Sequence, residues 1–334
     1  MFKCKETNKV FVVCPAHGRT GGLELLHQLV FTLNKMGINA AIAYTKIKQD
    51  RPVINPAYRC YVSDYVRFKD IKDSSENIVI ISEHQIEFMD QIKSAKVAIW
   101  WLSVDNYLKV YSPSVAYKYF GCKGVLWYLK NRRWRYKVAK INTRIGYNFA
   151  QSYYAIDYLQ KNNFSNIHFL SDYISQDYLD VNFNTGKQRN DVVLYNPKKG
   201  KKFSEYLMHK DNSIKWIPLI NLTNDQVREL LLTSKVYVDF GNHPGKDRFP
   251  REAAYCGCCV ITDKKGAAKF FEDVPIPEEY KFEDIPENGE KIIARILECF
   301  KDYDKDVDNF KRYRDMIAGE YDKFNNDVKH IFIN

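Results

Sequence analysis

Short apolar runs typical of buried strands alternate with helical patterns along this chain of 334 residues. This alternation begins near the N-terminus, stops at a polar stretch and begins again after it. The first series opens with a strand predicted over 10–15, a glycine-bearing loop over 17–22, a helix that ends at Gly37 and a strand over 39–44. Five apolar residues recur at helical spacing in that helix, namely Leu23, Leu26, Leu29, Val30 and Leu33. Strand, glycine loop, helix and strand in this order open a parallel sheet, so an α/β fold is predicted.

A polar stretch over 182–190 is the predicted linker between the first series and the second. Before it we expect further strands over 78–82, 97–102 and 167–170, with a helix between the first two, and a helix over 149–162. After it we expect strands over 191–195, 214–220, 236–240 and 259–262, and helices over 201–209, 224–232, 250–256 and 310–332. Two Rossmann-like domains are therefore predicted, one over 1–185 and one over 186–312, with a final helical segment over 313–334.

Composition and charge narrow the class of protein. Hydrophobic residues make up 45% of the chain and charged residues 28%, which is typical of a globular protein. The net charge of +10 indicates an anionic partner: nucleic acid, acidic lipid or a phosphorylated substrate. There is no signal peptide and no run of about 18 apolar residues, so we expect a cytoplasmic protein. The eight cysteines lack disulfide or zinc spacing, which favours reduced, buried thiols.

Two loops that follow predicted strands have the composition of phosphate sites. Gly21 and Gly22 stand where a helix begins, so the backbone can approach a ligand and the first N–H groups can bind phosphate. A tight turn explains these glycines equally well, because no GxGxxG or P-loop motif is present. In the second half Asn196, Lys198 and Lys199 follow a strand, and the lysines are suited to neutralise a diphosphate. An ordinary solvated turn is the alternative there.

The most informative segment is 239–257, DFGNHPGKDRFPREAAYCG. A strand ends at Phe240, and Pro250 is expected to begin a helix, because proline favours the first helical position. A helix dipole disfavours cations at its N-terminus, yet three gather there: Lys246, Arg248 and Arg251. We interpret them as a diphosphate site, with Glu252 binding the ribose hydroxyls. For Glu252 the alternative is a first-turn acid that complements the dipole.

Two motifs together resemble those of the retaining GT-B glycosyltransferases of the family-four type. They are Gly21-Gly22-Leu23-Glu24, similar to a GGxE loop, and Arg251-Glu252-Ala-Ala-x-x-Gly257-x-x-Val260-Ile261, similar to EAxxxGxPVI. Longer runs such as TGGLELLHQL look like a subgroup associated with surface-polysaccharide gene clusters. The resemblance implies two Rossmann-like domains facing across a cleft, with the last helix returning to the first domain. It also implies transfer from a nucleotide sugar to a glycan or polyprenyl-linked acceptor, with retention and without an obligatory metal or other cofactor.

Carried over by position, the resemblance assigns roles to single residues. Gly21 and Gly22 would offer N–H groups to the diphosphate or the sugar, Lys198 or Lys199 would balance the diphosphate, and Glu252 would hold the ribose. Glu252 matches the second glutamate of the family's E-x7-E motif, but at the position of the first glutamate this sequence has Pro244. The contact with the donor sugar could then come from Asn242, His243 or Asp247. His243 and Arg248 are catalytic candidates, Arg248 as a cation that stabilises the leaving diphosphate.

The buried strand that begins near residue 97 is expected to end in polar and aromatic residues at the carboxyl edge of the sheet. These are Asp105, Asn106 and Tyr107, where we place the acceptor, with Asp105 as a third catalytic candidate. A structural turn is the alternative. His84, which follows Glu83 after another strand, is a weaker candidate for the same face.

Basic and aromatic residues interleave over 123–144, where no acidic residue occurs. The basic residues are Lys123, Lys130, Arg132, Arg133, Arg135, Lys137, Lys140 and Arg144, and the aromatic ones include Trp127, Tyr128, Trp134 and Tyr136. This pattern favours peripheral contact with anionic lipid on the inner face of the cell membrane. A solvated basic helix is nearly as well supported, and nucleic acid is the least favoured partner.

Two other functions stay open on the sequence. A transferase of a non-sugar group to glycans would use the same scaffold. A degenerate GT-B protein that only binds its partners is favoured by Pro244 and opposed by Glu252, the basic cluster and the glycine loop.

Overall fold

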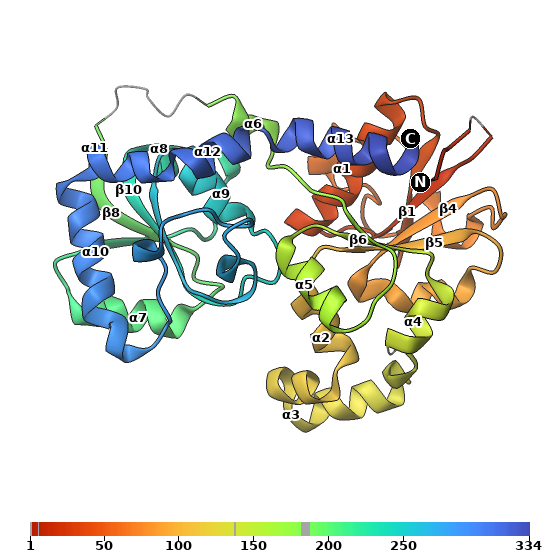
Figure 1. The fold of residues 1–334 in the computed structure, drawn as a ribbon, viewed down its shortest axis with the longest axis horizontal. Coiled ribbons are helices and arrows are strands. Elements are labelled where there is room, and N and C mark those ends of the chain that lie inside the picture. Colours follow the sequence, from red (N-terminus) through yellow and green to blue (C-terminus); the bar gives the residue numbers. More distant parts are fainter. Residues whose placement is uncertain (1, 6, 137, 182–187) are drawn as a thin grey trace. The chain divides into compact units, whose positions relative to one another are not determined.

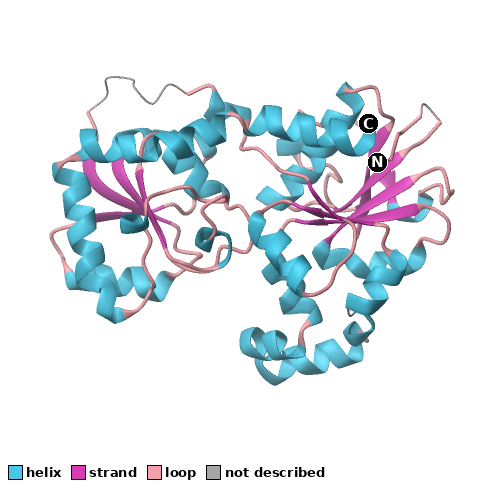
Figure 2. Cartoon of the chain, in the orientation of Figure 1, coloured by secondary structure: helices cyan, strands magenta, loops and turns pink. Residues whose placement is uncertain are grey.

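The computed structural model describes residues 2–5, 7–136, 138–181 and 188–334. The chain divides into two compact units, the first formed by residues 1–172 and 322–334 and the second by residues 173–321. Each unit contains one parallel sheet with helices on both faces (Figure 1, Figure 2). The predicted linker over 182–190 falls largely on 182–187, which lie outside the described residues.

Seven parallel strands form the sheet of the first unit, in the order β3-β2-β1-β4-β5-β6-β7. They are β1 Val10–Pro15, β2 Ala40–Thr45, β3 Val66–Arg67, β4 Ile78–Ser82, β5 Lys96–Trp101, β6 Tyr147–Ala150 and β7 Ile167–Phe169. In register, Val10 of β1 pairs with Ala40 of β2 on one side and with Ile78 of β4 on the other. The central strands are apolar on both faces because helices cover both faces.

The helices of the first unit include α1, which begins where Thr20 accepts a hydrogen bond from the N–H of Leu23. The five apolar residues predicted for its inner face are all buried, as expected. The helices are α1 Gly21–Lys35, α2 Val104–Tyr111, α3 Pro113–Lys130, α4 Val138–Arg144, α5 Tyr153–Lys161 and most of α13 Glu320–Phe332. Short 3₁₀ helices are η1 Pro56–Tyr58, η2 Phe68–Asp70, η3 Glu83–Gln91 and η4 Arg133–Tyr136.

Two predictions in the first unit are wrong. The helix predicted over 149–162 begins only at Tyr153, because Ser152 caps α5 and Phe149 belongs to β6 between β5 and β7. The strand predicted over 97–102 is β5, but Asp105, Asn106 and Tyr107 do not form its end as expected. They lie on α2, because Ser103 accepts the N–H of Asn106 and starts that helix.

Four parallel strands form the sheet of the second unit, in the order β11-β10-β8-β9. They are β8 Asn190–Tyr195, β9 Lys215–Pro218, β10 Ser234–Asp239 and β11 Cys259–Thr262. The helices are α6 Gln176–Leu179, α7 Lys201–Lys210, α8 Asn224–Thr233, α9 Arg248–Tyr255, α10 Gly289–Lys301, α11 Tyr303–Asp306 and α12 Lys311–Ala318. The 3₁₀ helices are η5 Gly266–Lys269, η6 Glu278–Tyr280, η7 Pro286–Asn288 and η8 Val307–Phe310. The four strands predicted for this half are therefore confirmed, with shifts of a few residues at their ends.

Two helix boundaries in the second unit differ from expectation. Helix α9 begins at Arg248 rather than at Pro250, since proline fits anywhere in a first turn, where its missing N–H has no partner to lose. The helix predicted over 310–332 is two helices, α12 and α13, separated at Gly319.

Each unit has its own apolar core. No disulfide joins the eight cysteines, and five of them are buried: Cys14, Cys256, Cys258, Cys259 and Cys299. Among the helices that the structure describes, none combines the length and the apolar character needed to cross a bilayer.

Candidate functional site

The strand order of the second unit determines where a ligand crevice can form. The chain continues from β8 to β9 on one side of the sheet, whereas β10 and β11 lie on the other side, so the order reverses between β8 and β10. In open α/β sheets ligands bind at the carboxyl ends of the strands next to such a reversal. Two loops meet at this point: 196–200, after β8, and 240–247, after β10.

The two loops approach each other through their backbones, which requires glycine at both contact positions. Gly200 has a φ of 55°, and a Cβ atom there would lie 1.5 Å from the carbonyl oxygen of Phe240. Gly241 has a φ of 136°, and a Cβ atom there would lie 2.8 Å from the backbone nitrogen of Gly200. A side chain at either position would force the loops apart.

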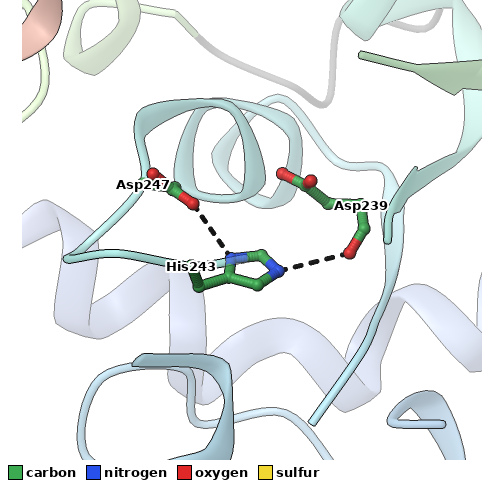
Figure 3. A group of neighbouring side chains, drawn as sticks. All are labelled: Asp239, His243 and Asp247. Atoms are coloured by element: carbon green, nitrogen blue, oxygen red, sulfur yellow. Dashed lines mark hydrogen bonds and ion pairs between the residues drawn. The ribbon is translucent and has the colours of Figure 1, made fainter. Parts of the chain in front are cut away.

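An ion-pair network joins the same two loops. Lys199 in the first loop pairs with Asp247 in the second. The Asp247 carboxylate also lies 3.1 Å from Nδ1 of His243, and Nε2 of His243 lies 3.2 Å from the backbone oxygen of Asp239 (Figure 3). Since His243 is buried and both ring nitrogens face oxygen acceptors, its imidazole is placed to donate from both.

The electrostatics of this network favour the charged forms. Burial alone would lower the pKa of His243, but the charge of Asp239 and the hydrogen bond to Asp247 prevail and raise it to about 9. Burial acts to raise the pKa of Asp247, whereas the charge of Lys199 and the bond from His243 bring it below its ordinary value. The pKa of Lys199 is raised: burial opposes its charge, and Asp239 and Asp247 outweigh the burial. The ammonium, imidazolium and carboxylate groups therefore hold the loops together as ions at neutral pH.

Asp263, directly after β11, completes the network. Its Oδ1 atom lies 3.4 Å from Nε2 of His243, and its Oδ2 atom accepts the N–H of Gly241 at 2.9 Å. Burial raises the pKa of Asp263 to about 6, although the charge of His243 acts in the opposite direction. Asp263 was not among the predicted site residues, although an acid immediately after a predicted strand marked its position.

Ligand atoms of Asp239, His243 and Asp247 lie within 4.8 Å of one another, close enough to surround a metal ion. In the arrangement described, these groups also have partners within the protein. Lys199 pairs with Asp247, and both ring nitrogens of His243 face oxygen acceptors. We interpret the contacts among Asp239, His243 and Asp247 as those that hold the 240–247 loop in its conformation.

Lys246 and Arg251 have a partner that no local pattern reveals. Glu320, the first residue of α13, lies 2.8 Å from Nζ of Lys246 and 2.7 Å from Nη1 of Arg251, and all three side chains are buried. Arg251 also donates to the backbone oxygens of Lys246 and Asp247. The expectation that these two cations face a diphosphate is corrected, because Glu320 compensates their charges inside the unit.

Arg248 is the more accessible member of the predicted site, whereas its partner Glu252 is buried. They make an i,i+4 ion pair at 3.2 Å in the first turns of α9, where the Arg248 side chain is 24% exposed. In the loop that Lys199 ties to this one, Lys198 is exposed, and its N–H donates to Oδ1 of Asn196 at 3.0 Å. The structure thus brings together Asn196, Lys198 and Lys199 with Arg248 and Glu252 at one reversal point.

In the first unit the strand order reverses between β1 and β4. Gly21 and Gly22 open α1 after β1, as predicted, and Glu83 and His84 follow β4. Glu83 is buried, and its Oε2 atom accepts the N–H of Leu102 at 2.9 Å. The side chain of Leu102 lies 3.7 Å from the position of a Cβ atom on Gly22. Sequence analysis gave Glu83 no role, although an acid after a buried strand marked the position.

The predicted acceptor residues lie on a helix and not at a strand end. Oδ1 of Asp105 accepts a hydrogen bond from the Tyr154 hydroxyl at 2.9 Å, and Asn106 is exposed. Tyr107 is buried in the core, and its hydroxyl donates to the backbone oxygen of Tyr136 at 3.2 Å. The expected acceptor contact of Tyr107 is therefore corrected: the helical period of α2 turns its ring inward.

The basic segment over 123–144 divides into an inward and an outward part. Arg133 pairs with Glu87 at 2.8 Å and Lys140 with Asp90 at 3.4 Å, so these two cations attach the segment to η3. Four others are exposed: Lys123, Lys130, Arg132 and Arg135. Lys137 lies outside the described residues.

Neither a protein-family profile nor a curated protein matches the sequence, whereas solved structures match nearly its whole length. HepE from Anabaena in complex with UDP-glucose has a TM-score of 0.64 at 12% identity, covering 97% of this chain and 98% of that one. Sucrose-phosphate synthase from Thermosynechococcus elongatus has a TM-score of 0.61 at 11% identity, with coverages of 97% and 98%. The catalytic domain of starch synthase IV from Arabidopsis thaliana, bound to ADP and acarbose, has a TM-score of 0.57 at 10% identity, with coverages of 96% and 99%. This likeness confirms the predicted GT-B fold class of two Rossmann-like units.

Proposed function

We propose that this protein is a glycosyltransferase that transfers a sugar from a nucleoside-diphosphate sugar to a glycan or lipid-linked acceptor. The proposal rests above all on the ion pair between the partly exposed Arg248 and the buried Glu252, at the strand-order reversal of the second unit. A guanidinium binds phosphate oxygens and a carboxylate accepts the two ribose hydroxyls, which are the two polar parts of a nucleoside diphosphate. The fold shared with HepE and sucrose-phosphate synthase supports the same proposal.

The chemistry asked of these residues is charge stabilisation. The reaction breaks the bond from the anomeric carbon to the diphosphate oxygen and forms a bond to the oxygen of an acceptor hydroxyl, whose proton passes to the departing diphosphate. Negative charge grows on the leaving diphosphate, and Arg248, Lys198 and the first N–H groups of α9 are the proposed groups that stabilise it. His243 is proposed to position the 240–247 loop, which leads into α9, through its bonds to Asp247 and Asp239. Asp247 in turn pairs with Lys199, which adjoins Lys198. Retention and metal independence are part of the proposal and rest on the family-four resemblance.

The first unit supplies the remaining proposed ligands. Gly21 and Gly22 would offer N–H groups to the diphosphate or the sugar, and Asp105 and Asn106 would bind the acceptor. The proposed acceptor is a glycan carried on polyprenyl diphosphate in bacterial surface polysaccharide synthesis. We also propose peripheral contact of the first unit with the inner face of the cell membrane.

A thermal-shift screen with UDP, GDP, ADP and UDP-glucose tests the donor site. We expect one diphosphate to raise the unfolding temperature, since a ligand at about 100 times its Kd adds about 2.7 kcal/mol. Arg248→Ala should weaken that ligand at least about tenfold, because a charge-assisted hydrogen bond is lost. Arg228→Ala removes an arginine from another exposed helical ion pair, to Asp225, and should leave binding unchanged. Equal effects of the two substitutions, or no stabilising nucleotide, would overturn the donor site.

Pro244, in place of the family's first glutamate, favours a second function, that of a protein that binds nucleotide sugar without turning it over. Mass spectrometry of the donor after incubation separates the two. Hydrolysis or transfer supports the enzyme, and stabilisation with an intact donor supports the binding protein.

A further inference from the structure

Solvent-facing apolar side chains are concentrated in one segment of the first unit. Among the described residues, thirteen large hydrophobic side chains are exposed, and seven of them lie within 117–134. The seven are Tyr117, Tyr119, Phe120, Leu126, Trp127, Leu129 and Trp134, of which Leu126 is the most exposed at 66%. A soluble protein seldom keeps so many apolar groups together on its surface unless they meet a partner.

Helix α3 carries six of these seven side chains and exposes them to solvent, and Trp134 lies on η4. Of the 18 residues of α3, Ala116, Gly124 and Tyr128 are the buried ones. Gly121, with a φ of 61°, divides the helix into two halves. A Cβ atom on Gly124 would lie 2.5 Å from the carbonyl oxygen of Ala116, so the halves fold closely against each other. Figure 1 shows α3, in yellow, standing off the sheet of the first unit.

The same region carries the net charge of the chain. Residues 106–156 contain ten of the 51 Lys and Arg residues and none of the 41 Asp and Glu residues. In the rest of the chain, the numbers of basic and acidic residues are therefore equal. The whole net charge of +10 belongs to residues 106–156. Five of its cations are exposed beside the apolar groups: Lys118, Lys123, Lys130, Arg132 and Arg135.

We propose that residues 117–135, the α3 surface, dock the protein on an anionic lipid bilayer. The exposed aromatic and leucine side chains would enter the boundary between headgroups and acyl chains, while the lysines and arginines contact lipid phosphates. The positive charge of this surface complements the negative headgroups of such a bilayer, and its exposed aromatic side chains complement the apolar layer beneath them. The inference rests on the proposed function only in that a lipid-linked acceptor lies in the same bilayer. It places the contact on 117–135 rather than on the predicted 123–144, because the exposed apolar side chains begin at Tyr117 and Lys140 pairs inward with Asp90.

Vesicle co-sedimentation tests the α3 surface. We expect the protein to bind vesicles of phosphatidylglycerol and phosphatidylcholine and to remain unbound with phosphatidylcholine alone. The variant Phe120→Ser/Leu126→Ser/Trp134→Ser, which removes three of the seven exposed apolar groups, should bind at least about tenfold more weakly. The charge variant Lys123→Gln/Lys130→Gln/Arg132→Gln should be weakened to a similar extent. The control Ile220→Ser/Phe271→Ser/Leu297→Ser replaces equally many exposed apolar residues in the second unit and should bind like the wild type.

The proposal is overturned if the wild type ignores phosphatidylglycerol vesicles or if both α3 variants bind like the control. It is also overturned, in favour of a nucleic-acid surface, if the charge variant loses binding to a random oligonucleotide while vesicle binding is unchanged. Stabilisation by the nucleotide found in the thermal-shift screen is measured on every variant. Retained stabilisation with lost vesicle binding confirms that the variants fold, and it separates this surface from the donor site.

Discussion

The charged residues of the second unit divide into those that hold the loops and those that face solvent. Lys246 and Arg251 share Glu320, which follows them by about 70 positions. No local pattern connects residues so far apart, so sequence analysis could identify the basic cluster and not the distribution of its charges. The same holds for Tyr107, whose inward direction depends on where α2 begins.

Glu320→Gln should strongly destabilise the protein. It leaves the charges of Lys246 and Arg251 buried without their counter-ion, which costs about 3–5 kcal/mol. Urea unfolding measures the loss. Glu290→Gln is the control, because the Glu290 side chain is 88% exposed in its pair with Lys210, and an exposed pair of this kind contributes little to stability. Similar stability of the two variants would show that Glu320 is not the counter-ion.

His243 should make stability depend on pH. Its pKa rises from 6.5 to about 9 on folding, so the protonated imidazole stabilises the native state fully below pH 6.5. This contribution, on the order of 3 kcal/mol, is lost as the pH rises through 9. We expect His243→Gln to flatten the decline of the urea midpoint between pH 6.5 and pH 9. His209→Gln, at an exposed histidine of α7, should leave the decline as in the wild type.

At the scale of elements, the sequence predicted those whose signals are local. The apolar period of α1 and the buried runs of β4 and β8 needed no tertiary information. Boundaries set by a single cap were harder. Ser152 caps α5 after β6, and Ser103 caps α2 after β5. The sequence alone does not show which serines cap a helix. The break between α12 and α13 at Gly319 could not be predicted either. Glu320, the next residue, forms ion pairs with Lys246 and Arg251, which lie far away in the sequence.

The contact between the loops after β8 and β10 should be intolerant of any side chain. Gly200→Ala adds a methyl group onto the backbone of Phe240, so we expect a loss of more than about 2 kcal/mol in urea unfolding. Gly37→Ala is the matched control, because Gly37 also has a positive φ, 79°, but no atom within 4 Å of the new group. It should cost about 1–2 kcal/mol from backbone strain alone. Equal losses would mean that the loops can separate freely.

At the scale of the whole molecule, α13 carries the chain from the second unit back to the first, and residues 322–334 complete the first unit. The Phe332 ring lies 5.4 Å from that of Phe2 and 6.2 Å from that of Phe149, and Phe324 stacks on Trp100 at 6.3 Å. The core of the first unit therefore needs residues from both ends of the sequence.

Phe332→Ala should unfold the first unit selectively. Removing a buried phenylalanine costs about 3–5 kcal/mol, whereas Ile333→Ala, at a neighbouring residue that is 41% exposed, should cost little. Limited proteolysis with mass spectrometry identifies which unit is cut. We expect early cuts within 1–172 and continued protection of 173–321. Protection of both units in Phe332→Ala would contradict the role given to α13.

The discontinuous first unit has a consequence for synthesis on the ribosome. Residues 1–172 emerge first, but Trp100 and Phe149 stay uncovered until 322–334 leave the exit tunnel. The second unit is continuous, so it can close its core while translation is still under way. We therefore expect the second unit to become protease-resistant before the first, although it is synthesised later. Until residues 322–334 are available, the incomplete first unit should depend on chaperones.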